Sequence, residues 1–313
     1  MRSQLKWYSL RWQTGVALLV LSFAAWYTLA GRYEHPVGSG PAGPSVSPQA
    51  FSCVWSTQKH VLIGIGDSIT AGYGASDGRG YFDLLVKSDD GACPDMKGID
   101  LSHVLPNLTT YNYGISYTTS DQHLIDQVPS VQKYPRNVKG IVVITSGGND
   151  LIHDYGRATP RDGAMYGCTY EQALEWTPSF RKRLRGIING VNHRFPGGCE
   201  IFLANIYDPT DGAGDIHNAN VVLPKWLDAE KSLNLFNRTI AEVCKEYPNV
   251  HLVDIHAQFL GHGIHCTNPW GKYYREDDPH YWYFANLEDP NDRGYDAIRR
   301  TFLIEMARVL GSS

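Results

Sequence analysis

Short runs of hydrophobic, mostly β-branched residues alternate along the chain with longer amphipathic segments. The hydrophobic runs predict strands at 60–65, 109–113, 140–146, 200–206 and 251–255. The amphipathic segments predict helices at 169–193, 225–247 and 293–310. In the last of these, Ile298, Phe302 and Met306 recur at four-residue spacing, so one face is expected to pack on a sheet. This alternation predicts an α/β domain whose parallel sheet is covered on both faces.

The N-terminal segment has the pattern of an export signal. Arg2, Lys6 and Arg11 precede an essentially apolar run over 14–30, and a stretch rich in Gly, Pro and Ser follows. A cleaved signal peptide and an uncleaved anchor that spans the membrane once both fit this pattern. We therefore expect a signal peptide or signal anchor at 1–30, a linker at 31–50 and the α/β domain at 51–313. The expected location is extracytoplasmic: periplasmic, cell-surface or secreted.

Composition excludes several classes of protein. The 313 residues include 28 Lys and Arg against 32 Asp and Glu. The chain therefore lacks the surplus of basic residues that a nucleic-acid-binding protein needs. The six cysteines are an even set compatible with disulfides in an exported chain, and no C-x-x-C pair is present. His262, His265 and Cys266 lie in a Gly-rich loop with no regular element to fix ligand geometry, so no metal site is predicted.

Small residues and amide donors follow three of the predicted strands. The three segments are Gly66-Asp67-Ser68, Asn112-Tyr113-Gly114 and Gly147-Gly148-Asn149-Asp150. The carboxyl ends of parallel strands meet at one edge of a sheet, where ligands bind. A serine hydroxyl there, with the N–H groups of Ser68 and Gly114 and the side-chain amide of Asn149, offers a nucleophile and an oxyanion hole.

With these three segments the chain resembles the GDSL-type esterases, also called SGNH hydrolases. The family carries a signature Ser, Gly, Asn and His on a flavodoxin-like sheet, and the resemblance spans about residues 59–310. It implies a flavodoxin-like three-layer α/β/α sandwich with a central parallel sheet. It also implies that Ser68 is the nucleophile and that Ser68, Gly114 and Asn149 form the oxyanion hole.

The fourth block of the family departs from its usual pattern. The family carries Asp-x-x-His directly before a Pro-Asn pair, but here Asn286 and Asp289 occupy the Asp and His positions. His280, nine residues upstream, restores the spacing with Asp277. We therefore predict His280 as the base, Asp277 as its partner and 281–288 as an aromatic insertion. The other candidates for the base are His153, His256, His262 and His265.

The predicted activity is ester hydrolysis by a serine esterase or lipase with a Ser68-His280-Asp277 triad and an acyl-enzyme intermediate. No cofactor is needed. Short acyl esters, lipids and acetylated sugars are the expected substrates, and the membrane is a partner only through 14–30 if that segment is uncleaved. Weaker substrate-lining candidates are Asp67, Tyr281 and Trp282, and the loop 208–215 is expected to line the substrate too. Two alternatives stay open: an acyltransferase with the same triad, and a non-catalytic glycan- or lipid-binding domain.

Overall fold

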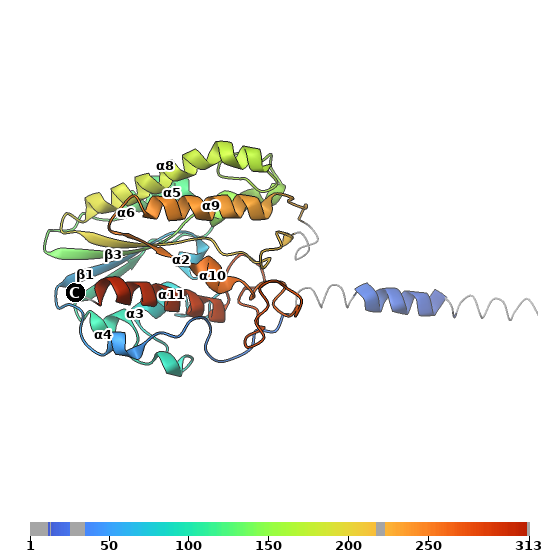
Figure 1. Cartoon of the computed structure of the whole chain (residues 1–313), viewed down its shortest axis with the longest axis horizontal. Helices are drawn as coiled ribbons and strands as arrows, with labels where there is room; N and C mark the ends of the chain where they lie inside the picture. The colour runs from blue at the N-terminus through green and yellow to red at the C-terminus, as the bar shows by residue number, and fades with distance from the viewer. Residues whose placement is uncertain (1–11, 13, 26–34, 217–222, 312–313) are drawn as a thin grey trace, which may run out of the picture. The chain divides into compact units, whose positions relative to one another are not determined.

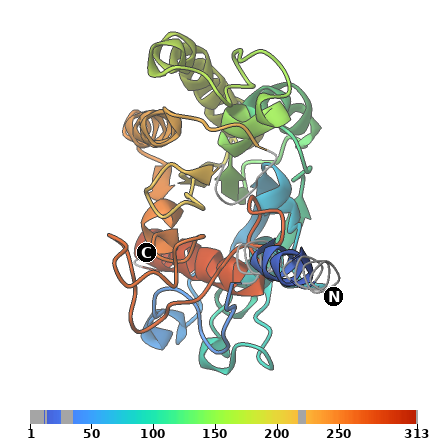
Figure 2. The ribbon, with the colours of Figure 1, turned by 90° about the vertical axis from the view of Figure 1, so that its right-hand side faces the viewer.

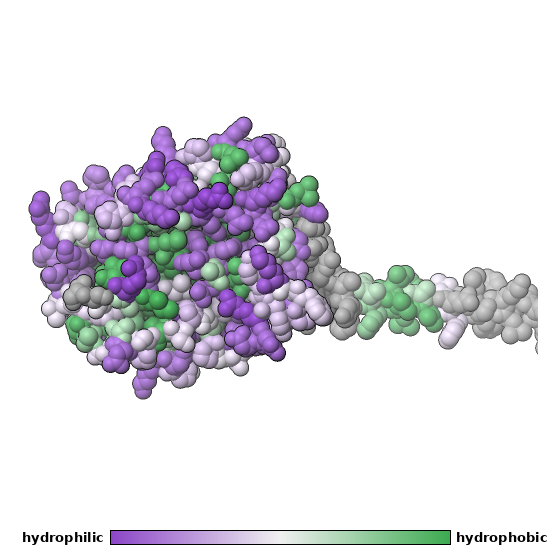
Figure 3. All heavy atoms as spheres, viewed as in Figure 1, coloured by the Kyte–Doolittle hydropathy of each residue, from purple (hydrophilic) through white to green (hydrophobic). Residues whose placement is uncertain are grey.

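The computed structural model describes residues 12, 14–25, 35–216 and 223–311. The chain divides into two compact units, Met1–Pro36 and Val37–Ser313. In the first unit residues 14–25 are helical and expose hydrophobic side chains such as Leu19 and Phe23. The helix is largely green, the colour of hydrophobic residues, in Figure 3. Among the described residues no helix is both long and apolar enough to cross a membrane. Residues 26–30 of the predicted apolar run lie outside the described residues.

The second unit is built on five parallel strands in the order β2-β1-β3-β4-β5 (Figure 1). The strands are β1 (Lys59–Ile65), β2 (Leu108–Asn112), β3 (Val138–Thr145), β4 (Cys199–Ala204) and β5 (Val250–Val253). All five were predicted from the hydrophobic runs, with small differences at the ends. The central strand, β3, is buried on both faces except at Lys139, which explains its continuous hydrophobic sequence.

Helices cover both faces of this sheet, so the predicted three-layer α/β/α sandwich is confirmed (Figures 1 and 2). The long helices are α8 (Tyr170–Arg194), α9 (Ala229–Cys244) and α11 (Asp292–Leu310). The shorter α-helices are α2 (Ser68–Ala71), α3 (Tyr81–Val86), α4 (Leu101–Val104), α5 (Ser120–Gln122), α6 (Val128–Ser130), α7 (Gly148–Ile152) and α10 (Ile255–Phe259). The remaining turns are η1 (Pro48–Phe51), η2 (Pro94–Met96), η3 (His123–Gln127) and η4 (His153–Gly156).

The hydrophobic core has two halves because successive side chains of a strand point to opposite faces. Ile141 and Val143 of β3 pack with α3, α4 and α11, whereas Val142 and Ile144 pack with α8 and α9. The predicted apolar face of α11 is buried as expected. Arg299 and Arg300 lie between these positions and are buried too, because they pair with Asp296 inside the protein.

Part of the predicted linker belongs to the folded unit. Ala42 is buried, its N–H donates to Asp296, and the carbonyl of Gly40 accepts from Arg293 of α11. The folded unit therefore begins well before residue 51. The six cysteines are all free thiols in the structure, and four of them are buried.

Candidate active site

Ser68 lies at the carboxyl end of β1, as the sequence predicts, because Gly66 allows the chain to turn there. Gly66 has a φ of +155°, and a Cβ at this position would come within 2.4 Å of Thr145 Oγ1. Only glycine fits this turn without displacing its neighbours. Ser68 is the first residue of α2, and its N–H makes no hydrogen bond within the described residues. The hydroxyl and this N–H are therefore both available at the rim of the sheet.

Asp67 fixes the orientation of this turn from inside the protein. Its Oδ1 accepts from the N–H of Ile69 at 3.2 Å and from the hydroxyl of Thr145 at 2.9 Å. Burial raises the pKa of Asp67 to about 7, with the negative charge of Asp289 adding to the effect and the bond from Thr145 opposing it. Asp67 also lines the cavity beside Ser68, as the weak prediction for this residue anticipated.

We expect Asp67→Asn to remove a pH dependence of stability. Between about pH 4 and about pH 7 the unfolded carboxyl is ionised while the folded one keeps its proton, so the free energy of unfolding falls as pH rises. The asparagine cannot ionise, and its Oδ1 can still accept from Ile69. Urea unfolding of both proteins across this pH range checks the prediction. The free energy of unfolding should decline more in the wild type than in the variant, by about a few kcal/mol, which is the effect that such a pKa shift implies. Equal slopes would contradict the prediction.

Asn149 faces the same place from the end of β3. Gly147, with a φ of +113°, begins the turn, and Asn149 lies in the following helix, α7. Its Nδ2 donates to the carbonyl of Thr118 at 3.0 Å, which leaves the second hydrogen of the amide for a ligand. The next residue, Asp150, is buried and accepts from Ser120 and Arg183, so the turn is held firmly.

In the structure the Gly114 amide already has a hydrogen-bond partner. The N–H of Gly114 donates to Oδ1 of Asn112 at 2.9 Å, and a Cβ on Gly114 would meet the backbone of Ala71 at 2.7 Å. Gly114 is therefore required for close packing against α2, and its amide is already used. Tyr117, three residues on, lines the hollow over Ser68 and has the left-handed φ of +68°. The Gly114 amide predicted for the oxyanion hole is thus bonded to Asn112 in this structure.

The side chain that faces the Ser68 hydroxyl is Asp289. Its carboxyl is buried, and burial raises its pKa, whereas hydrogen bonding from the side chains of Ser68 and Asn286 opposes the rise. Nδ2 of Asn286 donates to Oδ2 of Asp289 at 2.7 Å. Oδ1 of Asp289 is buried and has no hydrogen-bond partner among the described residues. Asn286 and Asp289 thus occupy in space, as in sequence, the place of an Asp-His pair beside a nucleophilic serine.

The predicted pairing of His280 with Asp277 and Ser68 differs from what the structure shows. Nδ1 of His280 lies 2.5 Å from Oδ1 of Asp278, and the same carboxylate accepts from Arg293 of α11. The ring packs against Gly38, where a Cβ would come within 2.5 Å of it. These contacts connect the loop before α11 to the N-terminal part of the folded unit. The Asp-x-x-His spacing is therefore present in sequence, but in space the imidazole is used for packing.

Tyr281 and Trp282 do not line a substrate cavity, contrary to the weak prediction. Both are buried, and the indole of Trp282 stacks on the ring of His262 at a centroid distance of 3.4 Å. His262 also contacts the carbonyl of His280 through Nδ1, and His265 pairs with Asp215. The aromatic residues Tyr281, Trp282 and Tyr283 of the predicted insertion are all buried and form a core under the loops.

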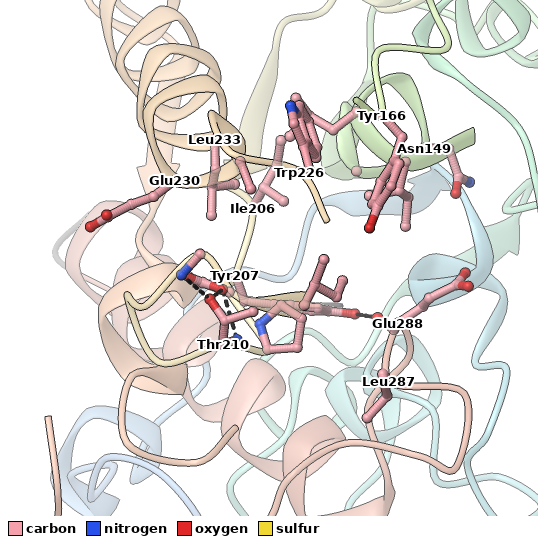
Figure 4. Close-up of a pocket in the computed structure, with 18 of the residues that line it drawn as sticks. Asn149, Tyr166, Ile206, Tyr207, Thr210, Trp226, Glu230, Leu233, Leu287 and Glu288 are labelled. Atoms are coloured by element: carbon pink, nitrogen blue, oxygen red, sulfur yellow. Dashed lines mark hydrogen bonds between the residues drawn. The ribbon is translucent and has the colours of Figure 1, made fainter. Parts of the chain in front are cut away.

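Three hollows share Asn149 and Glu288 as lining residues, and Ser68 lines two of them. The first encloses about 820 Å³, part of it open to solvent, and is lined mainly by hydrophobic side chains from α7, α9 and the loop after β4 (Figure 4). We call it the apolar cavity; the loop 208–215 lines it through Asp208, Pro209, Thr210 and Gly214, as expected. The second, the polar cavity, encloses about 980 Å³ beside Tyr117, His153 and Arg157. A small hollow of about 260 Å³ lies over Ser68 and Asp289.

A sequence profile of the GDSL-like Lipase/Acylhydrolase family matches residues 65–297. The chain belongs to the GDSL-like lipase/acylhydrolase family. Membership in this family places the chain among the hydrolases. It is similar to the uncharacterized protein YpmR of Bacillus subtilis (strain 168), with 25% identity over 252 residues that cover 78% of this chain and 80% of YpmR.

Two solved structures are also similar in fold. TesA shares 18% identity, with 80% of this chain and 100% of TesA covered and a TM-score of 0.48. Phospholipase A1 from Streptomyces albidoflavus NA297 shares 16% identity, with 82% and 99% covered and a TM-score of 0.44.

Four residues that line the hollows were not predicted as site residues from the sequence. They are Tyr117, Asn286, Glu288 and Asp289. A signal was present for two of them, because Asn286 and Asp289 stand at the family's Asp and His positions. Tyr117 and Glu288 carry no such signal, since only the backbone turns place them beside Ser68.

Proposed function

We propose that the protein is a serine esterase that hydrolyses carboxylic esters with an apolar acyl group, using Ser68 as nucleophile and Asp289 as general base. The observation that carries the proposal is the Ser68 hydroxyl, which faces the buried Asp289 carboxyl at the mouth of the apolar cavity. This assigns to Asp289 the role that the sequence suggested for His280. Asn286 is a positioning residue, because it holds the carboxylate through Oδ2 and leaves Oδ1 without a hydrogen bond among the described residues.

In the proposed reaction Asp289 accepts the hydroxyl proton of Ser68 while Oγ attacks the ester carbonyl carbon. The carbonyl oxygen becomes an oxyanion, for which the N–H of Ser68 and the free hydrogen of the Asn149 amide are donors. The intermediate then expels the alcohol, which takes the proton from Asp289. Water attacks the acyl-enzyme by the same steps, so the acid is released and Ser68 regains its proton.

A carboxylate base acts only when it is ionised, so activity should rise with pH through the pKa of Asp289. Burial raises this pKa above the usual range of an aspartate, which makes Asp289 a better proton acceptor than an exposed carboxylate. No metal ion or cofactor enters this reaction.

The apolar cavity supports an acyl chain longer than acetate. Ile206, Trp226 and Leu233 line one side of it, while Tyr207 and Leu287 line the other (Figure 4). Each methylene group that leaves water for such a lining contributes about 0.8 kcal/mol, or roughly fourfold in kcat/KM. Hydrolysis of p-nitrophenyl esters from acetate to dodecanoate tests the proposal, and kcat/KM should increase with chain length until the cavity is full. Absence of hydrolysis with every ester would contradict the proposed function.

Ala229→Phe is expected to shorten the preferred acyl chain. Ala229 lies at the start of α9 and lines the apolar cavity, so a phenyl group there takes up space that a long chain would use. We expect kcat/KM for dodecanoate to fall about tenfold or more and that for acetate to stay within about twofold. Leu227→Phe is the matched control, because Leu227 is 80% exposed two residues earlier. Equal losses for both esters would show that the acyl chain lies elsewhere.

We also propose that the protein is exported. The basic residues before the apolar run 14–30 support this location, and fractionation of the producing cells tests it. Whether the segment is cleaved does not change the proposed chemistry.

A further inference from the structure

We infer that the carboxylic acid of Glu288 donates a hydrogen bond to the oxyanion and is a further catalytic residue beside Ser68 and Asn149. This inference rests on the proposed function. It addresses a gap in the site, since the Gly114 amide is bonded to Asn112 and leaves the oxyanion with two donors. A tetrahedral oxyanion is best stabilised by donors that are in place before the reaction starts.

The position of Glu288 is the first argument. Among the described residues that line the hollows, Asn149 and Glu288 are the two that line all three of them. An ester carbonyl that reaches Ser68 therefore has Asn149 on one side and Glu288 on another. Figure 4 shows the Glu288 side chain extending into the open space below Asn149. Neither carboxyl oxygen of Glu288 makes a hydrogen bond within the described part of the chain, so the group is available to a ligand.

The backbone around Glu288 is the second argument, because it is held in an unusual turn. Leu287 has a φ of +67°, a conformation that a branched side chain rarely adopts and that costs on the order of 1–3 kcal/mol. Oδ1 of Asn286 accepts from the N–H groups of Glu288 and Asp289, and the Tyr207 hydroxyl donates to the Glu288 carbonyl. This turn directs two adjacent carboxyl groups into one site. A strained turn fixed from both sides is typical of functional loops.

The electrostatic surroundings favour the neutral acid. Burial, followed by the charge of Asp289, raises the pKa of Glu288 to about 8. The other ionisable groups that line a hollow with Glu288 are Asp67, Tyr73, Tyr117, His153, Asp154, Arg157, Tyr166, Tyr207, Asp208 and Glu230. Carboxyl groups outnumber the two basic groups in this set. Of the basic groups, Arg157 is exposed to solvent, and His153 lies 3.8 Å from the carboxylate of Asp154. At neutral pH Glu288 therefore keeps a proton that it can share.

The step moves no additional proton. When Ser68 Oγ attacks, the electron pair of the carbonyl π bond passes to oxygen, and the Glu288 O–H hydrogen-bonds to that oxygen. The proton of Ser68 goes to Asp289 and then to the leaving alcohol, so Glu288 has the same protonation state before and after. Once Glu288 is ionised, the donor is replaced by a negative charge beside the oxyanion. Turnover must then fall.

The experiment is the pH profile of kcat for p-nitrophenyl octanoate with the full chain, from about pH 5 to about pH 9, in wild type, Glu288→Gln and Glu288→Ala. We expect wild-type kcat to fall as pH passes about 8, because Glu288 ionises. Glu288→Gln should stay within about fivefold of wild type at pH 6 and lose the alkaline fall, since its amide donates at every pH. Glu288→Ala should lose about 10²-fold at pH 6, as expected for one missing oxyanion donor.

Asp67→Asn separates Glu288 from the other carboxyl that ionises near neutral pH. This variant should keep the fall of kcat at alkaline pH. If the fall were absent in Asp67→Asn, Asp67 would be the group that causes it, and the inference would be overturned. If kcat of Glu288→Gln falls at alkaline pH as in the wild type, the inference about Glu288 is overturned too. The proposed esterase function would still stand in that case, provided that Ser68→Ala is inactive. A wild type that hydrolyses none of the esters would overturn both. The pH dependence of Ser68 phosphonylation by an organophosphonate gives the same comparison without turnover.

Discussion

Replacing Ser68 by alanine is expected to lower kcat/KM for p-nitrophenyl octanoate by about 10⁴- to 10⁶-fold. Ser68 is the hydroxyl that faces both the base and the donor groups at the end of β1, so no neighbouring group can replace it. The residual rate would come from binding and from the oxyanion donors that the variant keeps, which include the backbone N–H of residue 68 and the Asn149 amide. Steady-state hydrolysis checks this, with the free energy of unfolding measured in parallel to confirm that the variant is folded.

Covalent labelling separates an enzyme from a non-catalytic binding domain. An organophosphonate should modify wild-type Ser68 and no other serine, which mass spectrometry of the digested protein would show. Only a serine whose proton can be removed by a neighbouring base reacts at a useful rate. A folded protein that is neither labelled nor active would indicate that the cavity binds a ligand without chemistry.

Asp289→Asn is expected to lower kcat/KM by about 10²- to 10⁴-fold, whereas His280→Ala should leave it within about twofold. The asparagine keeps the size of the side chain and its bond to Asn286, but it cannot accept the Ser68 proton. His280 packs against Gly38 and Asp278, so its removal affects that contact and not the proton transfer. The two variants measured side by side assign the base.

The reverse result is equally informative. If His280→Ala is inactive and Asp289→Asn retains full activity, the loop before α11 must rearrange to bring the imidazole to Ser68. The double variant Asn286→Asp with Asp289→His adds an independent readout. It should move the acidic limb of the pH profile toward the ordinary imidazole pKa of about 6.5.

Much of the fold was predictable because the determinants of each strand are local. The continuous hydrophobic run in β3 and the four-residue spacing in α11 specify burial without reference to the rest of the chain. Gly66 and Gly147 signal sharp turns at strand ends, and these turns place Ser68 and Asn149 as expected. The burial of Arg299 and Arg300 in α11 was not predictable, because each also bonds to a residue that is distant in sequence: Arg299 to Ser88 and Arg300 to Asp95.

The base was predicted from spacing, and spacing did not determine which residue faces Ser68. Two segments fit the family motif in part: 277–280 has the right residue types, and 286–289 has the right distance from α11. The position of α11 on the sheet decides between them, since Asn291 caps this helix and fixes the residues just before it beside Ser68. Residue type favoured the first segment, whereas the proposed mechanism assigns the role of the imidazole to the buried carboxyl of the second.

The order of the site along the chain has a consequence for synthesis. Ser68 directly follows the first strand, whereas Asn286 and Asp289 directly precede the last helix. A chain that emerges N-terminus first, from a ribosome or through a translocation channel, therefore presents its proposed nucleophile long before the carboxylate that we propose activates it. Under this proposal the nascent protein cannot attack ester bonds in the membranes or metabolites around it until its C-terminal end is free to fold. The topology itself would then prevent premature activity.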